Sequence, residues 1–179
     1  MKKLFMVLPL VFLLCFTFGC QDKEALAEFE EFKAQAEVEA QNKDVVKRYW
    51  DGKWNERRPE ILDELQTPDV VYHAPSMGGM NGIEEYKQAY GMFLSVLHDT
   101  QIKIEDMIAE GDKVMTRTTF SGVQKGELEG VPATGNPFKM SGFTVFRIVD
   151  GKIAEEWEDW DWLGFYQQLG MELKPKEGE

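Results

Sequence analysis

The chain has 179 residues, with 32 acidic and 20 basic side chains and a net charge of −12 at pH 7. This length suits one domain with one core, because domains most often contain about 100–150 residues. The acidic balance argues against nucleic acid as a partner, since binding to phosphates requires a basic surface. Keeping the protein soluble is the simpler role for so many surface carboxylates.

The first segment is typical of a secretion signal. Two lysines precede an apolar run over residues 4–18, and Gly19-Cys20 then lead into polar sequence. A charged start, a short apolar centre and a small residue at the cut define such a signal. A transmembrane helix is the weaker alternative, because the run contains Pro9 and is shorter than the roughly 20 residues that span a bilayer. We predict a signal peptide over residues 1–19.

Cys20 is the predicted site of lipid attachment. Gly19 and Cys20 resemble the end of a bacterial lipobox, although Thr17 and Phe18 are less usual there. Ordinary cleavage and a retained anchor are the alternatives. Lipidation would place the protein in the bacterial cell envelope, on the extracytoplasmic side, with the membrane as a partner through the lipid. The other cysteine, Cys15, lies within the predicted signal, so the mature fold would have no disulfide.

Three regions are expected after the signal. Residues 20–42 are rich in Glu, Ala, Gln and Lys and contain few large apolar groups. This composition predicts an acidic tether that is helical or flexible. The domain itself is predicted over residues 43–171, and residues 172–179 form a charged tail.

Helical spacing dominates the first half of the predicted domain. Trp50 and Trp54 recur four residues apart beside other apolar residues, which gives a helix one broad apolar face. Pro59 can open a short second helix. Apolar residues at helical spacing predict a third helix that begins at Ile83 and ends near His98.

The apolar period then changes from 3.6 towards 2, which indicates strands. The expected strands cover residues 70–73, 102–108, 114–122, 138–149 and 152–160. Asp150-Gly151 is the strongest hairpin signal, and a closing helix is predicted over residues 163–169. Helices followed by an antiparallel meander predict an α+β domain whose helices cover one face of a curved sheet. The space between them would enclose an apolar pocket for a small hydrophobic ligand.

Five segments in this order carry a family resemblance: DVVYHAP at 69–75, IAEGDKV at 108–114, GVPATG at 130–135, DGKIAEEW at 150–157, and WDWLG followed by QQLG at 160–170. Over residues 43–171 the chain resembles the SnoaL-like polyketide cyclases, also called ester cyclases, of the nuclear transport factor two-like superfamily. The resemblance implies a half-cone fold, with N-terminal helices packed on a curved, antiparallel-rich sheet. It also leaves open a homodimer formed through that sheet.

The resemblance implies chemistry without a cofactor. In such cyclases an aspartate removes a proton from the carbon next to a carbonyl, and the enolate closes a ring within the same molecule. Asp161 is the matching aspartate in this chain, whereas a histidine of the family falls on Arg147. A Thr-His pair that many members carry before the glycine of the middle strand is absent from residues 123–126.

The last predicted strand has two faces. Alternation places Glu155, Trp157, Asp159 and Asp161 on one face, and Glu156, Glu158, Trp160 and Trp162 on the other. A carboxylate beside Trp157 in a dry pocket would have a raised pKa, which suits removal of a C–H proton. Asp161 is therefore a candidate catalytic residue, and its alternative role is the N-cap of the following helix.

His73 and Arg147 are the other polar candidates. His73, at a strand end, is a second candidate catalytic residue that could hydrogen-bond a ligand carbonyl or shuttle a proton, and a structural role is equally open. No second histidine stands at ligand spacing, so no metal site is expected. Arg147 could point inward, to Asp161, Glu155 or an anionic ligand, or outward into a cross-strand ion pair. The candidate substrate-binding residues are Arg147, Trp157, Tyr90, Phe93 and Trp54, with plain core packing as the alternative for the aromatic ones.

Two functions are compatible with these features. The first is a SnoaL-like pocket protein that acts on a small hydrophobic carbonyl compound by cofactor-free acid/base chemistry, through intramolecular aldol-type cyclisation or isomerisation. The alternative is a non-catalytic, envelope-tethered module that binds a small molecule or a partner. Secretion favours the alternative, because polyketide intermediates are intracellular. The feature that separates the two is an unpaired carboxylate in the pocket.

Overall fold

The computed structural model describes residues 7–75, 78–128, 130–172 and 174, and it describes side chains from residue 23 onward. The side chains of the predicted signal and of Cys20 therefore lie outside the described part. The chain divides into two compact units, residues 1–38 and residues 39–179. Among the described residues, no helix combines the length and the apolar character needed to cross a membrane.

Helix α1 (Val7–Trp50) makes up the described part of the first unit and continues into the second. Residues 23–38 are exposed throughout, including large apolar side chains such as Phe29. Glu30 and Lys33 form an ion pair across one turn, at 3.2 Å. Ala, Glu and Lys, which are strong helix formers, fill this stretch and account for its helical structure.

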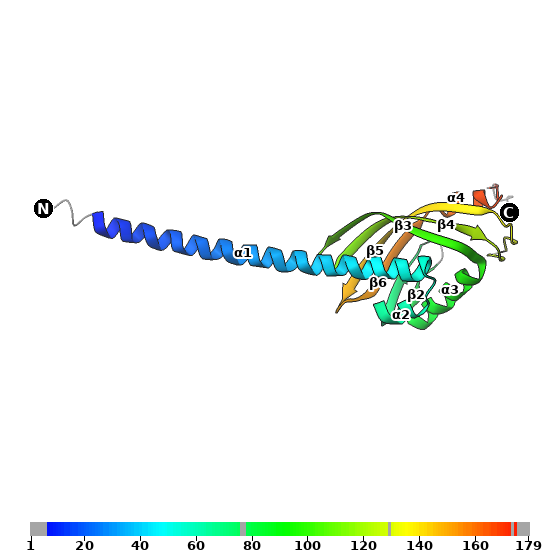
Figure 1. Cartoon of the computed structure of the whole chain (residues 1–179), viewed down its shortest axis with the longest axis horizontal. Coiled ribbons are helices and arrows are strands. Elements are labelled where there is room, and N and C mark those ends of the chain that lie inside the picture. Colours follow the sequence, from blue (N-terminus) through cyan, green and yellow to red (C-terminus); the bar gives the residue numbers. More distant parts are fainter. Residues whose placement is uncertain (1–6, 76–77, 129, 173, 175–179) are drawn as a thin grey trace, which may run out of the picture. The chain divides into compact units, whose positions relative to one another are not determined.

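Four shorter helical segments follow in the described part of the second unit: η1 (Asp51–Asn55), α2 (Glu60–Leu65), α3 (Ile83–Val96) and α4 (Trp162–Gln168) (Figure 1). Pro59 stands at the N-cap of α2, which confirms the predicted short helix. The prediction that the third helix ends near His98 is wrong, because α3 ends at Val96 and His98 already belongs to a strand. Segment η1 is a π-helical turn, a feature that is frequent at functional sites, and it contains the buried Lys53.

The sheet has six strands in the described residues: β1 (Gln66–His73), β2 (Met80–Asn81), β3 (Leu97–Glu110), β4 (Lys113–Gln124), β5 (Pro137–Val149) and β6 (Lys152–Trp160). Their order is β2-β1-β6-β5-β4-β3. All neighbours are antiparallel except β1 and β6, which are parallel. The short β2 was not predicted, because two residues in a glycine-rich loop carry no alternating pattern.

The hairpin between β5 and β6 follows directly from its two turn residues. Asp150 and Gly151 have φ angles of 49° and 75°, and a type I′ turn requires positive φ at both central positions. An aspartate followed by glycine meets that requirement with little strain. The hairpin prediction is confirmed. The turn pairs Val149 with Lys152 and Ile148 with Ile153, and a register shift between Ile148 and Arg147 then places Arg147 opposite Glu155.

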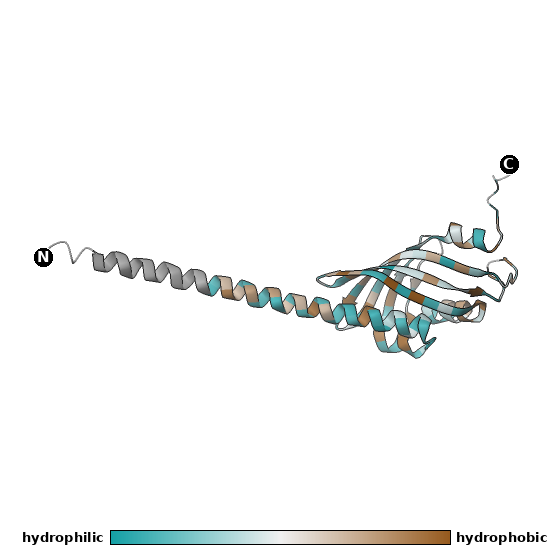
Figure 2. Ribbon diagram, turned by 45° about the horizontal axis from the view of Figure 1, so that its top comes forward, coloured by the Kyte–Doolittle hydropathy of each residue, from teal (hydrophilic) through white to brown (hydrophobic). Residues whose placement is uncertain are grey.

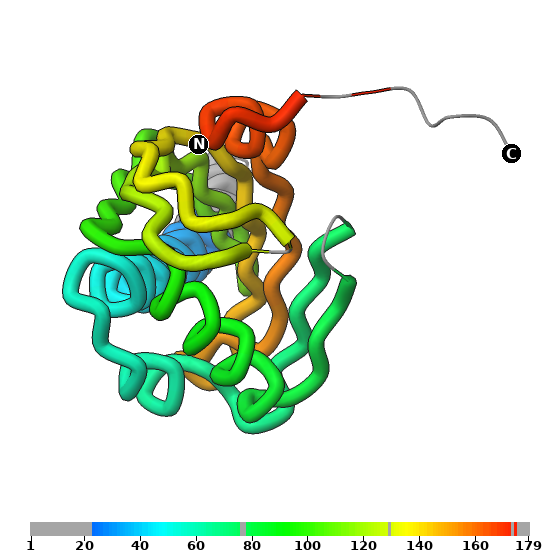
Figure 3. The backbone as a smooth tube through the Cα atoms, turned by 90° about the vertical axis from the view of Figure 1, so that its right-hand side faces the viewer, coloured from blue at the N-terminus to red at the C-terminus, as the bar shows by residue number. Residues whose placement is uncertain are grey.

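The core lies between the helices and one face of the sheet. Side chains alternate between buried and more exposed along β4 and β5. Figure 2 shows hydrophilic and hydrophobic residues interleaved along the strands. The sheet curves around the helices of the domain (Figure 3), and fully buried Trp50 and Phe146 meet edge to face between the two layers. The domain therefore has the predicted α+β architecture, with helices on the concave face of a mostly antiparallel sheet.

Candidate functional site

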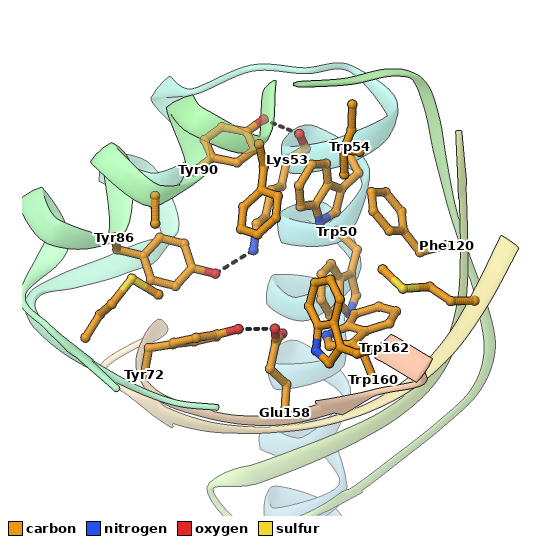
Figure 4. A pocket seen from close by; sticks show the side chains of 15 residues that line it. Trp50, Lys53, Trp54, Tyr72, Tyr86, Tyr90, Phe120, Glu158, Trp160 and Trp162 are labelled. Carbon is orange, nitrogen blue, oxygen red and sulfur yellow. Dashed lines mark hydrogen bonds between the residues drawn. The ribbon is translucent and has the colours of Figure 1, made fainter. Parts of the chain in front are cut away.

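A cavity of about 50 Å³, counted as space for the centres of water molecules, lies between the helices and the concave face of the sheet (Figure 4). Most of its lining is aromatic or aliphatic: Trp50, Trp54, Tyr72, Met80, Tyr86, Ala89, Tyr90, Phe93, Leu97, Phe120, Met140, Trp160 and Trp162. Two lining side chains carry charge, Lys53 and Glu158. In Figure 4 they point towards each other from opposite walls, Lys53 from the helical side and Glu158 from β6.

Lys53 is held by phenol groups. Only 6% of its surface is exposed, and its Nζ donates to Tyr86 Oη at 2.5 Å and to Tyr49 Oη at 3.0 Å. Its Nζ also lies 5.3 Å from the ring centre of Trp54 and 5.4 Å from that of Trp50, which is within the range of cation–π attraction. Within the described part of the chain, Lys53 forms no ion pair with a carboxylate.

Burial lowers the pKa of Lys53, because a charged ammonium loses its hydration in the core. The carboxyl groups of Glu156 and Glu158 act in the opposite direction and favour the ammonium form. The cavity thus contains an amine whose charge is opposed by desolvation and supported only by aromatic rings, phenols and more distant carboxylates.

Glu158 is the acidic group of the cavity. It is half-buried and accepts a short hydrogen bond from Tyr72 Oη. Burial raises the pKa of Glu158, and the neighbouring Glu156 raises it further, whereas Lys53 and the Tyr72 hydrogen bond lower it. The net direction is upward, which moves this carboxyl towards the range in which it can both take and return a proton.

A second carboxyl, Glu156, lies behind the cavity wall. It is fully buried and accepts hydrogen bonds from Gln66 Nε2 at 2.8 Å and from Tyr86 Oη at 3.2 Å. Burial raises the pKa of Glu156 above its ordinary value. Because Tyr86 also accepts from Lys53, the amine, the phenol and this carboxyl form one continuous hydrogen-bonded chain.

Three of the aromatic residues singled out in the sequence line the cavity, namely Trp54, Tyr90 and Phe93. Trp54 packs edge to face on Tyr90, with ring centres 5.4 Å apart. Tyr90 Oη donates a short hydrogen bond to the backbone oxygen of Lys53. This bond ties α3 to the π-helical turn and so fixes the position of the lysine.

Asp161 lies outside the cavity lining. It is exposed and caps α4, where its Oδ1 accepts a hydrogen bond from the backbone N–H of Gly164 at 2.9 Å. The structure therefore places it in the second of the two roles considered for it, at the start of a helix. Gly164 is required there, because a Cβ at that position would lie 2.3 Å from Asp161 Oδ2.

The remaining sequence candidates meet on the outer face of the sheet, away from the cavity. Arg147 Nε donates to Glu155 Oε2 at 2.8 Å, and His73 Nε2 lies 2.9 Å from Glu155 Oε1. The ring of His73 stacks on Trp157, with centres 5.1 Å apart and planes at 7°. Hydrogen bonds from His73 and Arg147 lower the pKa of Glu155. Arg147 thus forms the outward cross-strand ion pair.

The groups that carry the cavity's charge were not singled out in the sequence, although two signals point to them. Lys53 lies three residues after Trp50 and next to Trp54, and a lysine on an apolar helix face is unusual. Glu156 and Glu158 share a strand face with Trp160. Alternation separates this face from the other face of the strand, but it does not say which of the two turns inward.

A curved sheet closed by helices over a cavity with opposed acid and base groups defines an α+β pocket protein of the nuclear transport factor two-like class. The sequence profile of the SnoaL-like polyketide cyclases matches residues 43–169, and the chain belongs to that family.

Named relatives fit this assignment. The chain is 33% identical to the aklanonic acid methyl ester cyclase DauD of Streptomyces sp. (strain C5) over 137 residues, which cover 75% of this chain and 82% of the relative. It is 30% identical to the nogalonic acid methyl ester cyclase of Streptomyces nogalater over 129 residues, covering 70% and 95%. The solved structure of TsrD from Streptomyces laurentii superposes with a TM-score of 0.66 at 33% identity, covering 73% and 96%.

Proposed function

We propose that this protein catalyses cofactor-free proton transfer at the carbon next to a ketone, in a small hydrophobic carbonyl compound, and so promotes aldol-type ring closure or isomerisation within that compound. One observation carries the proposal: the half-buried carboxyl of Glu158 faces the buried amine of Lys53 across an aromatic cavity. Two relatives named as methyl ester cyclases support ring closure as the outcome.

Glu158 is the proposed general base. A carboxylate of ordinary pKa is too weak a base to remove a C–H proton efficiently, and burial together with Glu156 raises the pKa of Glu158. The hydrogen bond from Tyr72 fixes the orientation of the carboxyl. A carboxyl poised in this way can accept the proton and then return it to the product, which is the pattern of acid/base pairs in other cofactor-free enzymes.

The opposite wall is the proposed site of the carbonyl oxygen. Removal of the proton transfers negative charge to this oxygen, and a positive or hydrogen-bonding group placed beside it stabilises that charge. Lys53 supplies this group, and the phenol of Tyr86 holds it in place. Because most of the cavity lining is apolar, the attraction is stronger than it would be in solution.

The dimensions of the cavity favour a small substrate. One water molecule needs roughly 10–15 Å³ by the same measure, so about 50 Å³ holds only a few waters. Trp54, Tyr90 and Phe93 provide flat apolar walls, which suit an aromatic or alicyclic ketone. A larger polycyclic compound requires α3 or α4 to move away from the sheet.

The test is hydrogen exchange at the carbon next to the carbonyl. The full chain is incubated in D₂O with 4-phenyl-2-butanone, and loss of the α-proton signals is followed by NMR. Glu158→Gln should bind the ketone and lose the exchange, because an amide cannot act as a base. Asp161→Asn is the matched control, since asparagine also caps helices and Asp161 lies outside the cavity.

Each result discriminates between the functions. Exchange by the unmodified chain and by Asp161→Asn, but not by Glu158→Gln, supports the proposal. Equal exchange by all three proteins contradicts it. Binding of the ketone by all three without exchange, measured by quenching of tryptophan fluorescence, identifies the cavity as the site of a non-catalytic binding module.

We also propose that the protein is attached to the bacterial cell envelope by a lipid on Cys20, as the charged start, apolar run and Gly19-Cys20 pair indicate. The chain produced in a bacterial host should then fractionate with the envelope, and intact mass should include the lipid on Cys20. Cys20→Ala should lack the lipid and leave the membrane fraction. If the chain that retains Cys20 has an intact mass without the lipid, this proposal is overturned.

A further inference from the structure

The amine of Lys53 has an unusual set of partners for a buried lysine. Buried ammonium groups are normally paired with carboxylates. Here the Nζ donates instead to the phenol oxygens of Tyr86 and Tyr49, and among the described residues it forms no ion pair. It lines the cavity and so can be reached by a bound ligand. This combination is typical of lysines that react as nucleophiles in apolar pockets.

A path for the amine's proton is already built. Lys53 Nζ lies 2.5 Å from Tyr86 Oη, and Tyr86 Oη lies 3.2 Å from Glu156 Oε2. Moving one proton from the amine to the phenol oxygen, and the phenol's own proton to the carboxylate, leaves two neutral groups. Two separated charges in a buried site are costly, so burial brings the neutral and the charged forms closer in free energy.

We propose that Lys53 forms an imine with the ketone carbonyl of the ligand, and that Tyr86 and Glu156 carry the proton that the amine gives up. This inference rests on the proposed function and narrows it to ketones, since esters and carboxylates do not form imines under such conditions. Lys53 is then a catalytic residue, Tyr86 and Glu156 relay its proton, and Glu158 remains the base that acts on the α-carbon.

The steps balance without any further reactant. The lone pair of the amine attacks the carbonyl carbon, a C–N bond forms, and the oxygen takes up the proton that nitrogen loses. The proton that the relay took from the amine returns from Glu156 through Tyr86 to this hydroxyl, the C–O bond breaks, water leaves, and a cationic iminium remains. Glu158 takes the α-proton, and the C–H electron pair becomes the C=C bond of an enamine. The enamine carbon attacks a second carbonyl of the same molecule or regains a proton, and one water hydrolyses the iminium to restore Lys53.

Covalent capture tests the imine directly. The full chain is mixed with 4-phenyl-2-butanone and treated with sodium borohydride, which reduces an iminium to a stable secondary amine. Intact mass should increase by the mass of the ketone less one oxygen atom, once per chain, and peptide mapping should place the increase on Lys53. Tyr86→Phe should slow the capture by about a hundredfold, because general acid/base assistance contributes at least that much.

Two variants separate a covalent from an electrostatic role. Lys53→Arg keeps a cation in the cavity but cannot form an imine, so it should bind the ketone and give no adduct. Lys47→Arg, at an exposed position of α1 shortly before Lys53, should be captured like the unmodified chain. Capture spread over surface lysines, or binding of the ketone with no adduct on Lys53, overturns the inference.

The two proposals fail separately. If Lys53→Arg still exchanges the α-protons of the ketone, and the unmodified chain is not captured on Lys53, the acid/base function is supported and the imine is overturned. Loss of exchange in Glu158→Gln together with capture on Lys53 supports both. If Lys53→Arg does not fold, as judged by circular dichroism, peptide mapping of the unmodified chain still decides between Lys53 and the surface lysines.

Discussion

Replacing Glu156 with glutamine should change how the stability of the protein depends on pH. Glutamine has the same shape as glutamate and cannot ionise. It can still accept a hydrogen bond from Gln66 and make one with Tyr86, the two partners that Glu156 has now. At low pH, where the carboxyl of Glu156 is protonated, the two proteins should differ in free energy of unfolding by only about 1 kcal/mol.

The expected sign follows from the raised pKa of Glu156. The ordinary pKa of a glutamate carboxyl is 4.5. Just above pH 4.5 the carboxyl of Glu156 has lost its proton in the unfolded chain but keeps it in the folded chain. The contribution of Glu156 to stability is therefore fully present below pH 4.5 and is lost as the pH rises through its folded-state pKa. Glu156→Gln has no such loss, so its stability relative to the unmodified chain should rise by up to about 1.4 kcal/mol per pH unit in that window.

Urea unfolding followed by tryptophan fluorescence, repeated from about pH 3 to about pH 8, measures this difference and also covers the window below pH 4.5 in which Glu155 titrates. Glu155→Gln is the control of opposite sign. His73 and Arg147 lower the pKa of the Glu155 carboxyl. The contribution of Glu155 to stability is therefore present above pH 4.5, its ordinary pKa, and is lost as the pH falls through its folded-state pKa. A stability difference for Glu156→Gln that does not change with pH, or that falls as the pH rises, would refute a buried carboxyl with a raised pKa.

Three further outcomes are expected. Asp161→Ala should lower the free energy of unfolding by about 1 kcal/mol through loss of the helix cap, measured by urea, while leaving hydrogen exchange on the ketone unchanged. Gly142→Ala places a Cβ 2.3 Å from the ring of Trp160, so it should cost about 1–3 kcal/mol and weaken ketone binding, measured by urea and by fluorescence quenching. Tyr72→Phe removes a hydrogen bond that lowers the pKa of Glu158, so the pH profile of exchange, followed by NMR, should shift to higher pH.

The fold could be predicted because its signals are local. The β5–β6 hairpin is encoded by Asp150-Gly151, which both adopt positive φ, and α2 by Pro59 at its start. Strand lengths were predicted less well, since β1 begins at Gln66 and β3 already at Leu97. Both extensions depend on pairing with other strands, β1 with the distant β6 and β3 with the following β4, and the pattern within one strand does not reveal this pairing.

The charged site was harder to predict because long-range pairing creates it. Tyr72 meets Glu158 across 86 positions of sequence, through the parallel pairing of β1 with β6. The pattern of β6 shows two faces, each with tryptophan and carboxylates, and only the position of the helices decides which face is inside. Asp161 has the residue type expected of a catalytic base, but the strand ends one residue before it and its carboxyl caps α4.

The partners of the Lys53 amine are difficult to explain by their contribution to the stability of the fold. Apolar residues of similar size usually stabilise a core as well as a buried polar network does, and a half-paired network is worse. A neighbouring carboxylate would neutralise Lys53, yet aromatic rings surround it and both nearby carboxyls lie beyond ion-pair distance in the described structure. Rings and phenols hold the amine in place without neutralising it, which leaves its charge or its lone pair available to a ligand. A site that binds only hydrophobic molecules has no need for this arrangement, whereas a site that reacts with a carbonyl group does.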